Sequence, residues 1–299
     1  MLYMKKTFAS NFGQAIIVAI IAFLCMTMVY PYLNQLAISF NDGMDTNLGG
    51  ITIFPRKFTL DNYKTVFNSQ GIFNAFFISI SKTVINVILA VTVTFSAAYA
   101  LTRRNLKGRK LITTFFCIPM YLHAGLIPLY ILYRTLGLIN NYWVYILPFC
   151  FSFYNMVILR SFIQEIPISL EESALLDGAN EIVVMFKVIV PLSLPAIATV
   201  TLWVAVGQWN DWVTTLYYIT DSELYTLQYL IMRIIKQGEQ LQQMAIMDAM
   251  GVSVENLSKT TEESVKAAML IITSVPIIIV YPFLQKYFVK GVTLGAVKE

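Results

Sequence analysis

Long apolar stretches, nearly free of charged residues, alternate with polar segments along the chain. A helix that crosses a bilayer needs about 20 mostly apolar residues, because its backbone polar groups must be satisfied within the membrane. The pattern predicts six such spans, at residues 13–36, 73–102, 111–134, 138–162, 191–219 and 267–288. We therefore expect an all-α membrane protein in which residues 1–299 form a single transmembrane domain.

The composition agrees with a lipid environment. Of the 299 residues, 57% are hydrophobic and only 13% are charged, and the mean hydropathy is +0.66. A soluble domain carries about 25% charged residues, so too few charges are present here to cover a water-exposed surface. The net charge of +4 is also too small to indicate a nucleic-acid-binding protein.

The basic residues predict the orientation in the membrane. Lys and Arg concentrate in cytoplasmic loops, and short loops count most. The segment RRNLKGRK, residues 103–110, is rich in both and follows the second predicted span. This places both chain ends in the cytoplasm (N-in, C-in). The apolar stretch near the N-terminus is too long for a signal peptide, so we interpret it as an uncleaved first span.

Side chains that usually carry catalysis or bind metals are few. The cysteines are Cys25, Cys117 and Cys150, each in an apolar stretch without a partner at metal-ligand spacing, and His123 is the single histidine. Cysteines in such surroundings are expected to be small core residues. We predict no catalytic residue and no metal site. The sequence also lacks a G-x-x-x-x-G-K-[ST] phosphate-binding loop, so we predict no ATP bound through that motif.

An acidic cytoplasmic segment, residues 165–187, separates the fourth and fifth predicted spans. Ser169 followed three residues later by Glu172 fits a capping box, and Gly178 suits the end of a helix. The pattern predicts a helix from Ser169 to Asp177. Helices that lie on anionic lipid usually carry Lys or Arg, so the acidic character favours a protein groove as the partner. The acids could instead only cap and solubilise the loop.

This segment resembles the EAA loop of ATP-binding-cassette (ABC) importer permeases, which reads Glu-Ala-Ala, three residues, Gly, nine residues, Ile-x-Leu-Pro. The matching positions are Glu172, Ser173 (in place of Ala), Ala174, Gly178 and Pro191. The stretches SAAYALTRR, LGLINNYWVYILP, QWNDW and QKYFVKGVTLGAVKE resemble the carbohydrate-uptake subfamily, closest to its maltose-type, six-span partner.

The resemblance implies the type I ABC importer permease fold in a multi-pass protein of the bacterial plasma membrane. It implies that the helix Ser169–Asp177 couples to an ATPase through Glu172, Ser173, Ala174, Asp177, Gly178 and Pro191. The implied partners are a second homologous permease, two ATP-binding subunits and an extracellular solute-binding protein. ATP and Mg would be bound by the ATPase partner, so this chain would hold no cofactor and would not be an enzyme.

The resemblance also implies a sugar substrate, and it favours an oligosaccharide or glycan fragment. The substrate would cross between the two permeases, beside Gln208, Trp209, Asn210 and Trp212 of the fifth span. A Trp near the end of a span is equally typical of an interfacial anchor. Asp211, the one acid within the predicted spans, is expected near the outer end and paired with an outer basic group.

Two extracellular segments are long, residues 42–68 and 220–266. Each could contact an extracellular partner or form a solvated cap, and the sequence leaves both open. The alternative function is a secondary, ion-coupled transporter without an ATPase partner. Such a transporter needs ionisable sites near the middle of the membrane, for which the spans offer only Asp211 as an acid.

Overall fold

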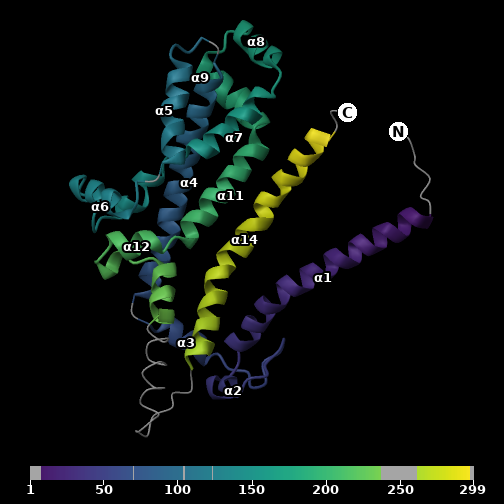
Figure 1. Cartoon of the computed structure of the whole chain (residues 1–299), viewed down its shortest axis with the longest axis vertical. Helices are drawn as coiled ribbons and strands as arrows, with labels where there is room; N and C mark the ends of the chain where they lie inside the picture. Colours follow the sequence, from purple (N-terminus) through teal and green to yellow (C-terminus); the bar gives the residue numbers. More distant parts are fainter. Residues whose placement is uncertain (1–7, 70, 104, 123, 237–260, 297–299) are drawn as a thin grey trace. The chain divides into compact units, whose positions relative to one another are not determined.

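The computed structural model describes residues 8–69, 71–103, 105–122, 124–236 and 261–296. These ranges are mainly helical, and their β-pairing is an isolated antiparallel bridge between Asn41 and Phe58 (Figure 1). The chain divides into two compact units. Unit 1 comprises Met1–Gln70 with Ile234–Ser274, and unit 2 comprises Gly71–Arg233 with Val275–Glu299.

Three helices are long and apolar enough to cross a membrane by themselves. They are α1 (Phe8–Ser39), α4 (Ile72–Thr102) and α14 (Glu262–Ala296), and they coincide with the first, second and sixth predicted spans. The apolar side chains along the middle of α1 are exposed, with Met28 at 76%. Lipid or another subunit must therefore cover this surface in the membrane.

Three further candidate spans are bent pairs of helices rather than straight ones. They are α5 (Arg109–Tyr121) with α6 (Leu126–Thr135), bent by 119°; η1–η2 (Tyr142–Tyr145, Leu147–Phe149) with α7 (Phe153–Gln164), bent by 43°; and the helix Glu181–Leu192 with α11 (Leu194–Asn210), bent by 81°. Counting each pair as one span brings the total in the described residues to six. Gly125, with φ of +81°, precedes α6 and permits the sharpest of these turns.

The segment leading into α11 contains α8 (Ile168–Leu176), α9 (Glu181–Val184), a π-helical turn (Met185–Ile189) and α10 (Val190–Leu192). Pro191 has no N–H to donate to the carbonyl four residues earlier, at Lys187. The turn just before it widens instead, and Val190 N donates to Met185 O five residues back. After α11 the backbone is extended at Asp211, and the chain resumes in α12 (Val213–Tyr218).

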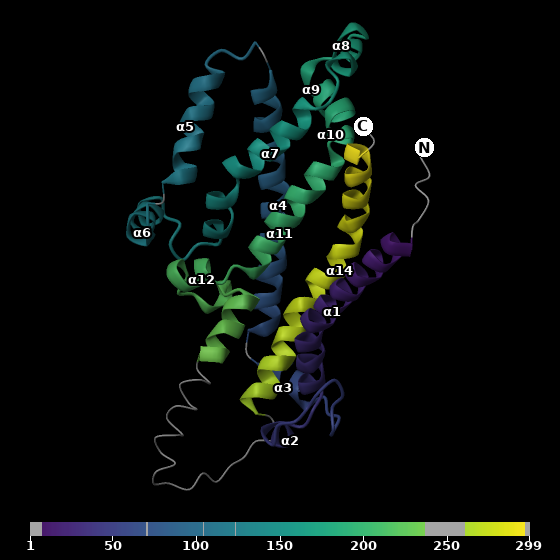
Figure 2. The ribbon, with the colours of Figure 1, turned by 45° about the vertical axis from the view of Figure 1, so that its right-hand side comes forward.

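The core of unit 2 lies between α4, α7, α9 and α11. Buried side chains from all four meet there, among them Phe95, Met156, Leu159, Val184 and Val200. Figure 2 shows α4, α7 and α11 running side by side, with α8 and α9 at the end where α4 leads towards α5. A second cluster surrounds the buried Val144 and Tyr145 of η1, η4 (Ser222–Leu224) and the end of α12. Close packing of these side chains stabilises the arrangement of the helices.

Unit 1 contains a folded segment, which the basic residues predict to be extracellular, with α2 (Gly43–Asn47) and α3 (Asp61–Phe67). The buried Asn41 amide donates to Asp45 and Thr46 and accepts from the backbone N–H groups of Arg56 and Lys57. These bonds order part of the segment 42–68, and whether it contacts a partner or only covers the membrane helices stays a prediction. Of the other long segment, 220–266, the structure describes η4 and a helix over 227–236, and residues 237–260 lie outside the described residues.

Candidate functional site

The predicted coupling helix is present as α8, but it begins differently from the prediction. α8 starts at Ile168 after Pro167, without a side-chain cap, so Ser169 is an internal residue and the capping box is wrong. The physical reason is Pro167, whose fixed φ of −57° suits a helix start two residues earlier, with Pro167 rather than Ser169 at the N-cap. Glu172, Ser173 and Asp177 are exposed, whereas Ala174 packs against the core of unit 2.

Gly178 ends α8 as the sequence predicts. Its φ of +86° is left-handed, and the turn closes through Gly178 N to Leu175 O and Ala179 N to Ala174 O, both 3.0 Å. This pair of bonds satisfies carbonyl groups that a helix end otherwise leaves without donors. A Cβ on Gly178 would meet no atom within 4 Å, so glycine is favoured here by its backbone conformation rather than by close packing.

An ion pair that the sequence analysis missed ties α8 to the end of α4. Arg103 is the residue after α4. Its two terminal nitrogens, Nη1 and Nη2, donate to the carboxylate of Glu171 in α8, with Nη2–Oε1 at 2.9 Å. Burial lowers the pKa of Arg103, but the hydrogen bonds and charge of Glu171 outweigh it, so its pKa lies above the usual value. Tyr99 donates to Glu181 at 2.9 Å and stacks on Arg103, with 4.1 Å from ring centroid to Cζ. In the sequence, Arg103 and Arg104 contributed to the predicted orientation and to the family resemblance, but not to a contact with α8.

A groove of about 470 Å³ lies at the ends of η2, α7 and α11. Gln208 and Asn210, two of the predicted cavity residues, line it together with Asp211. The other lining residues are aromatic, amide, hydroxyl or small side chains: Asn86, Pro148, Phe149, Phe151, Ser152, Asn155, Trp203, Val204 and Gly207. Asn86 and Asn155 could have been found from the sequence, because amide side chains are rare within apolar spans and usually face the protein interior.

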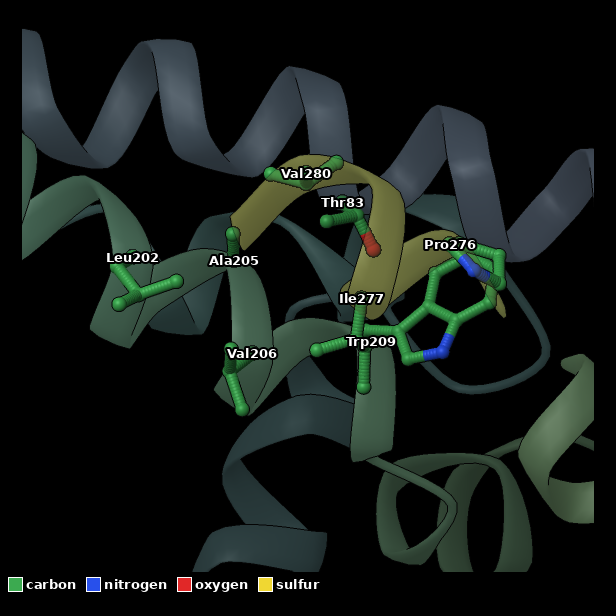
Figure 3. A pocket seen from close by; sticks show the side chains of 8 residues that line it. All are labelled: Thr83, Leu202, Ala205, Val206, Trp209, Pro276, Ile277 and Val280. Carbon is green, nitrogen blue, oxygen red and sulfur yellow. The ribbon is translucent and has the colours of Figure 1, made fainter. Parts of the chain in front are cut away.

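Trp209 and Trp212, the two tryptophans predicted to lie beside the substrate path, do not line this groove. Trp209 is buried and lines a separate apolar pocket of about 70 Å³ with Thr83, Pro276 and Ile277 (Figure 3). Its ring also meets Phe76 edge-on, with 6.1 Å between centroids. Trp212, half-buried before α12, does not line either of these two cavities. The role of all four residues in substrate passage stays a prediction.

Asp211 pairs with a basic residue, as expected. Its partner is Lys82, which lies about a third of the way along α4 and is fully buried. Among the described residues, no group of His, Cys, Asp and Glu side chains is arranged to hold a metal ion.

The profile of the family described as "Binding-protein-dependent transport system inner membrane component" matches residues 90–294. The chain belongs to this family. The permease is therefore a multi-pass membrane subunit of an ABC importer and a transport component rather than an enzyme, as the EAA-type loop predicted.

Named relatives and a solved structure agree with this membership. The permease is 36% identical to the polygalacturonan/rhamnogalacturonan transport system permease protein YtcP of Bacillus subtilis, over 90% of this chain and 92% of the relative. It is 32% identical to the galactooligosaccharides transport system permease protein GanQ of the same organism, over 93% of each. It also matches a chain in the crystal structure of a bacterial ABC transporter involved in import of the acidic polysaccharide alginate, with a TM-score of 0.82, 25% identity, and 95% and 99% of the two chains covered.

Proposed function

We propose that the permease forms one half of the path along which an ABC importer moves an oligosaccharide or glycan fragment into the bacterial cell. The groove of about 470 Å³ carries this proposal. Its aromatic side chains suit the apolar faces of sugar rings, and its amide and hydroxyl groups suit sugar hydroxyls. The relatives are named for transport of polygalacturonan or rhamnogalacturonan and of galactooligosaccharides, and these names support the same substrate class.

The remaining half of the path would come from a second homologous permease. The groove lies along elements of one chain only, so a polar ligand there needs a second wall before it is shielded from lipid. In the orientation predicted by the basic residues, α8 faces the cytoplasm and the segment 42–68 faces outward. An extracellular solute-binding protein would deliver the sugar, which agrees with the family's description.

The exposed face of α8 would dock on the ATPase subunits. Glu172, Ser173 and Asp177 are exposed there, as is the apolar Leu176 at 88%. A face that combines acidic, polar and apolar side chains is better suited to binding in a protein groove than to exposure to water. Two ATP-binding subunits would hold the ATP and Mg, and their closure would move α8 as a rigid body.

Reconstitution in proteoliposomes tests this function. The purified complex, with ATP inside and the binding protein outside, should accumulate labelled galacturonan or galactose oligosaccharides and should be insensitive to a protonophore. The complex should also retain a P-loop ATPase and a second permease through purification. Uptake by the permease alone, without ATP and abolished by the protonophore, would instead establish the ion-coupled transporter.

A further inference from the structure

Lys82 is a charged residue in the interior of a predicted span. It sits in α4, and its side chain is 0% exposed. A buried charge at this depth is costly and is almost always paired. Lys82 Nζ donates to the backbone oxygen of Asp211 at 3.0 Å and lies 3.4 Å from the carboxylate oxygen Oδ2 of the same residue. The ammonium group also lies 4.9 Å from the ring centroid of Tyr145.

The contact with the backbone oxygen falls where the helix is interrupted. α11 ends at Asn210, and Asp211 has an extended backbone with φ of −74° and ψ of 109°. Carbonyl groups at such a break have lost their helical donors and must find others. Lys82 supplies a donor to one of them. The second carboxylate oxygen of Asp211 accepts from Thr214 N at 3.1 Å, which holds the start of α12.

Neighbouring hydrogen bonds fix the surroundings of this contact. The buried Tyr145 hydroxyl bonds to Thr215 Oγ1 at 2.8 Å and donates to Leu224 O at 2.9 Å. Thr215 Oγ1 bonds in turn to Thr226 Oγ1 at 2.9 Å. Polar networks that are satisfied in this way hold one arrangement of the elements they join.

The residues beside the helix break that Lys82 supports form part of the groove wall. Gln208, Asn210 and Asp211 line the groove from the last turn of α11 and the residue after it. Their direction depends on where α11 stops and how the backbone turns at Asp211. Lys82 does not line the groove, so any effect it has on the substrate acts through these residues.

We propose that Lys82 is a positioning residue for the translocation groove: its hydrogen bond to the backbone oxygen of Asp211 holds the break after Asn210, so that the polar end of α11 faces the groove. The inference rests on the proposed function for the identity of the substrate. If Lys82 only neutralised the charge of Asp211, its role would be merely structural. The positioning role and the charge-neutralising role differ in which variants restore activity.

Three variants in the complete complex separate these roles: Lys82→Met, Lys82→Arg, and Lys82→Met combined with Asp211→Asn. The double variant carries no unpaired charge but still lacks the donor to the backbone oxygen. Uptake in proteoliposomes should fall at least tenfold in Lys82→Met and stay at least fivefold low in the double variant. Lys82→Arg should stay within about threefold of wild type, because a guanidinium donates to the same oxygens.

A second readout needs no assembled complex. Asn210→Cys is introduced into a chain whose three native cysteines are replaced by Ala, and its rate of maleimide labelling is measured in membrane vesicles. The rate should change severalfold with Lys82→Met or the double variant, but not with Lys82→Arg. An unchanged rate in both Met-containing chains, or full recovery of uptake in the double variant, would overturn the proposal. A wild-type complex that imports no glycan would contradict the proposed function, whereas the labelling result would still decide the role of Lys82.

Discussion

Arg103 and Glu171 join the end of α4 to α8, the proposed coupling helix, although 68 residues separate them in the chain. The guanidinium binds the carboxylate with two hydrogen bonds, which is the most directional ion pair available to proteins. Their side chains are 24% and 11% exposed, so the pair is only partly screened by water. If α8 docks on an ATPase as proposed, a movement of α8 would therefore be passed to α4 through this pair.

Replacing Arg103 should weaken coupling between ATP hydrolysis and transport. Hydrogen bonds to charged groups contribute about 1.5–3 kcal/mol, and about 1.4 kcal/mol corresponds to a tenfold change. We expect Arg103→Gln to lower the number of sugars imported per ATP hydrolysed by about tenfold, with the complex still assembled. The ratio is measured in proteoliposomes. Lys107→Gln, an exposed cation in the same loop, is the matched control, and an equal loss in both variants would contradict the prediction.

Substitutions at Gly178 should separate backbone conformation from docking. A left-handed backbone costs an ordinary L-residue about 1–2 kcal/mol, and Asn tolerates it best. Gly178→Asn and Gly178→Ala should therefore retain most of the uptake, because a Cβ meets no atom of this chain. Gly178→Arg should insert normally in the membrane and lose uptake, because its long side chain stands on the exposed docking face. Normal uptake by Gly178→Arg would remove Gly178 from the coupling surface.

Trp203 should contribute to binding of the sugar in the groove. It is 45% exposed, lines the groove and lies 6.3 Å from Tyr154, ring centroid to ring centroid. We expect Trp203→Ala to lower uptake by about tenfold, or about 1.4 kcal/mol, without changing the basal ATPase rate. Trp143→Ala is the matched control, because Trp143 is similarly exposed but does not line this groove. An equal effect of the two variants would argue against a sugar contact at Trp203.

The stability of the folded segment 42–68 should depend on pH through Asp45. The hydrogen bond from Asn41 lowers the pKa of the Asp45 carboxyl; burial opposes this, and Arg56 lowers it further, so the folded pKa lies below the usual value. A lowered pKa adds stability above the unfolded pKa, about 3.9, and this stability is lost as the pH falls through the folded pKa.

The corresponding measurement is the Tm of the purified permease in detergent between pH 7 and pH 3. Wild type should exceed Asp45→Asn in Tm at pH 7, and the difference should shrink below about pH 4. Asp61→Asn is the control, because the Asp61 carboxylate is 45% exposed beside Lys64. A difference between wild type and Asp45→Asn that is independent of pH would contradict the assignment.

Local patterns in the sequence predicted much of this permease. The scarcity of charges located the apolar helices, because lipid excludes both charged side chains and unpaired backbone groups. Gly178 predicted the end of α8, because a left-handed residue is a local requirement that glycine meets without strain. The spacing from Glu172 to Pro191 also led to the correct family.

Contacts between distant residues were decided only by the tertiary structure. Lys82 and Asp211 are 129 residues apart in the chain. The hydropathy pattern around either residue does not indicate that the other lies beside it. The resemblance to the permease family likewise placed Trp209 and Gln208 beside one predicted cavity, whereas the packing of α11 buries the first in an apolar pocket and turns the second towards the groove. Neighbouring residues on a helix point in directions about 100° apart, so only the packing of helices determines which of them faces the substrate path.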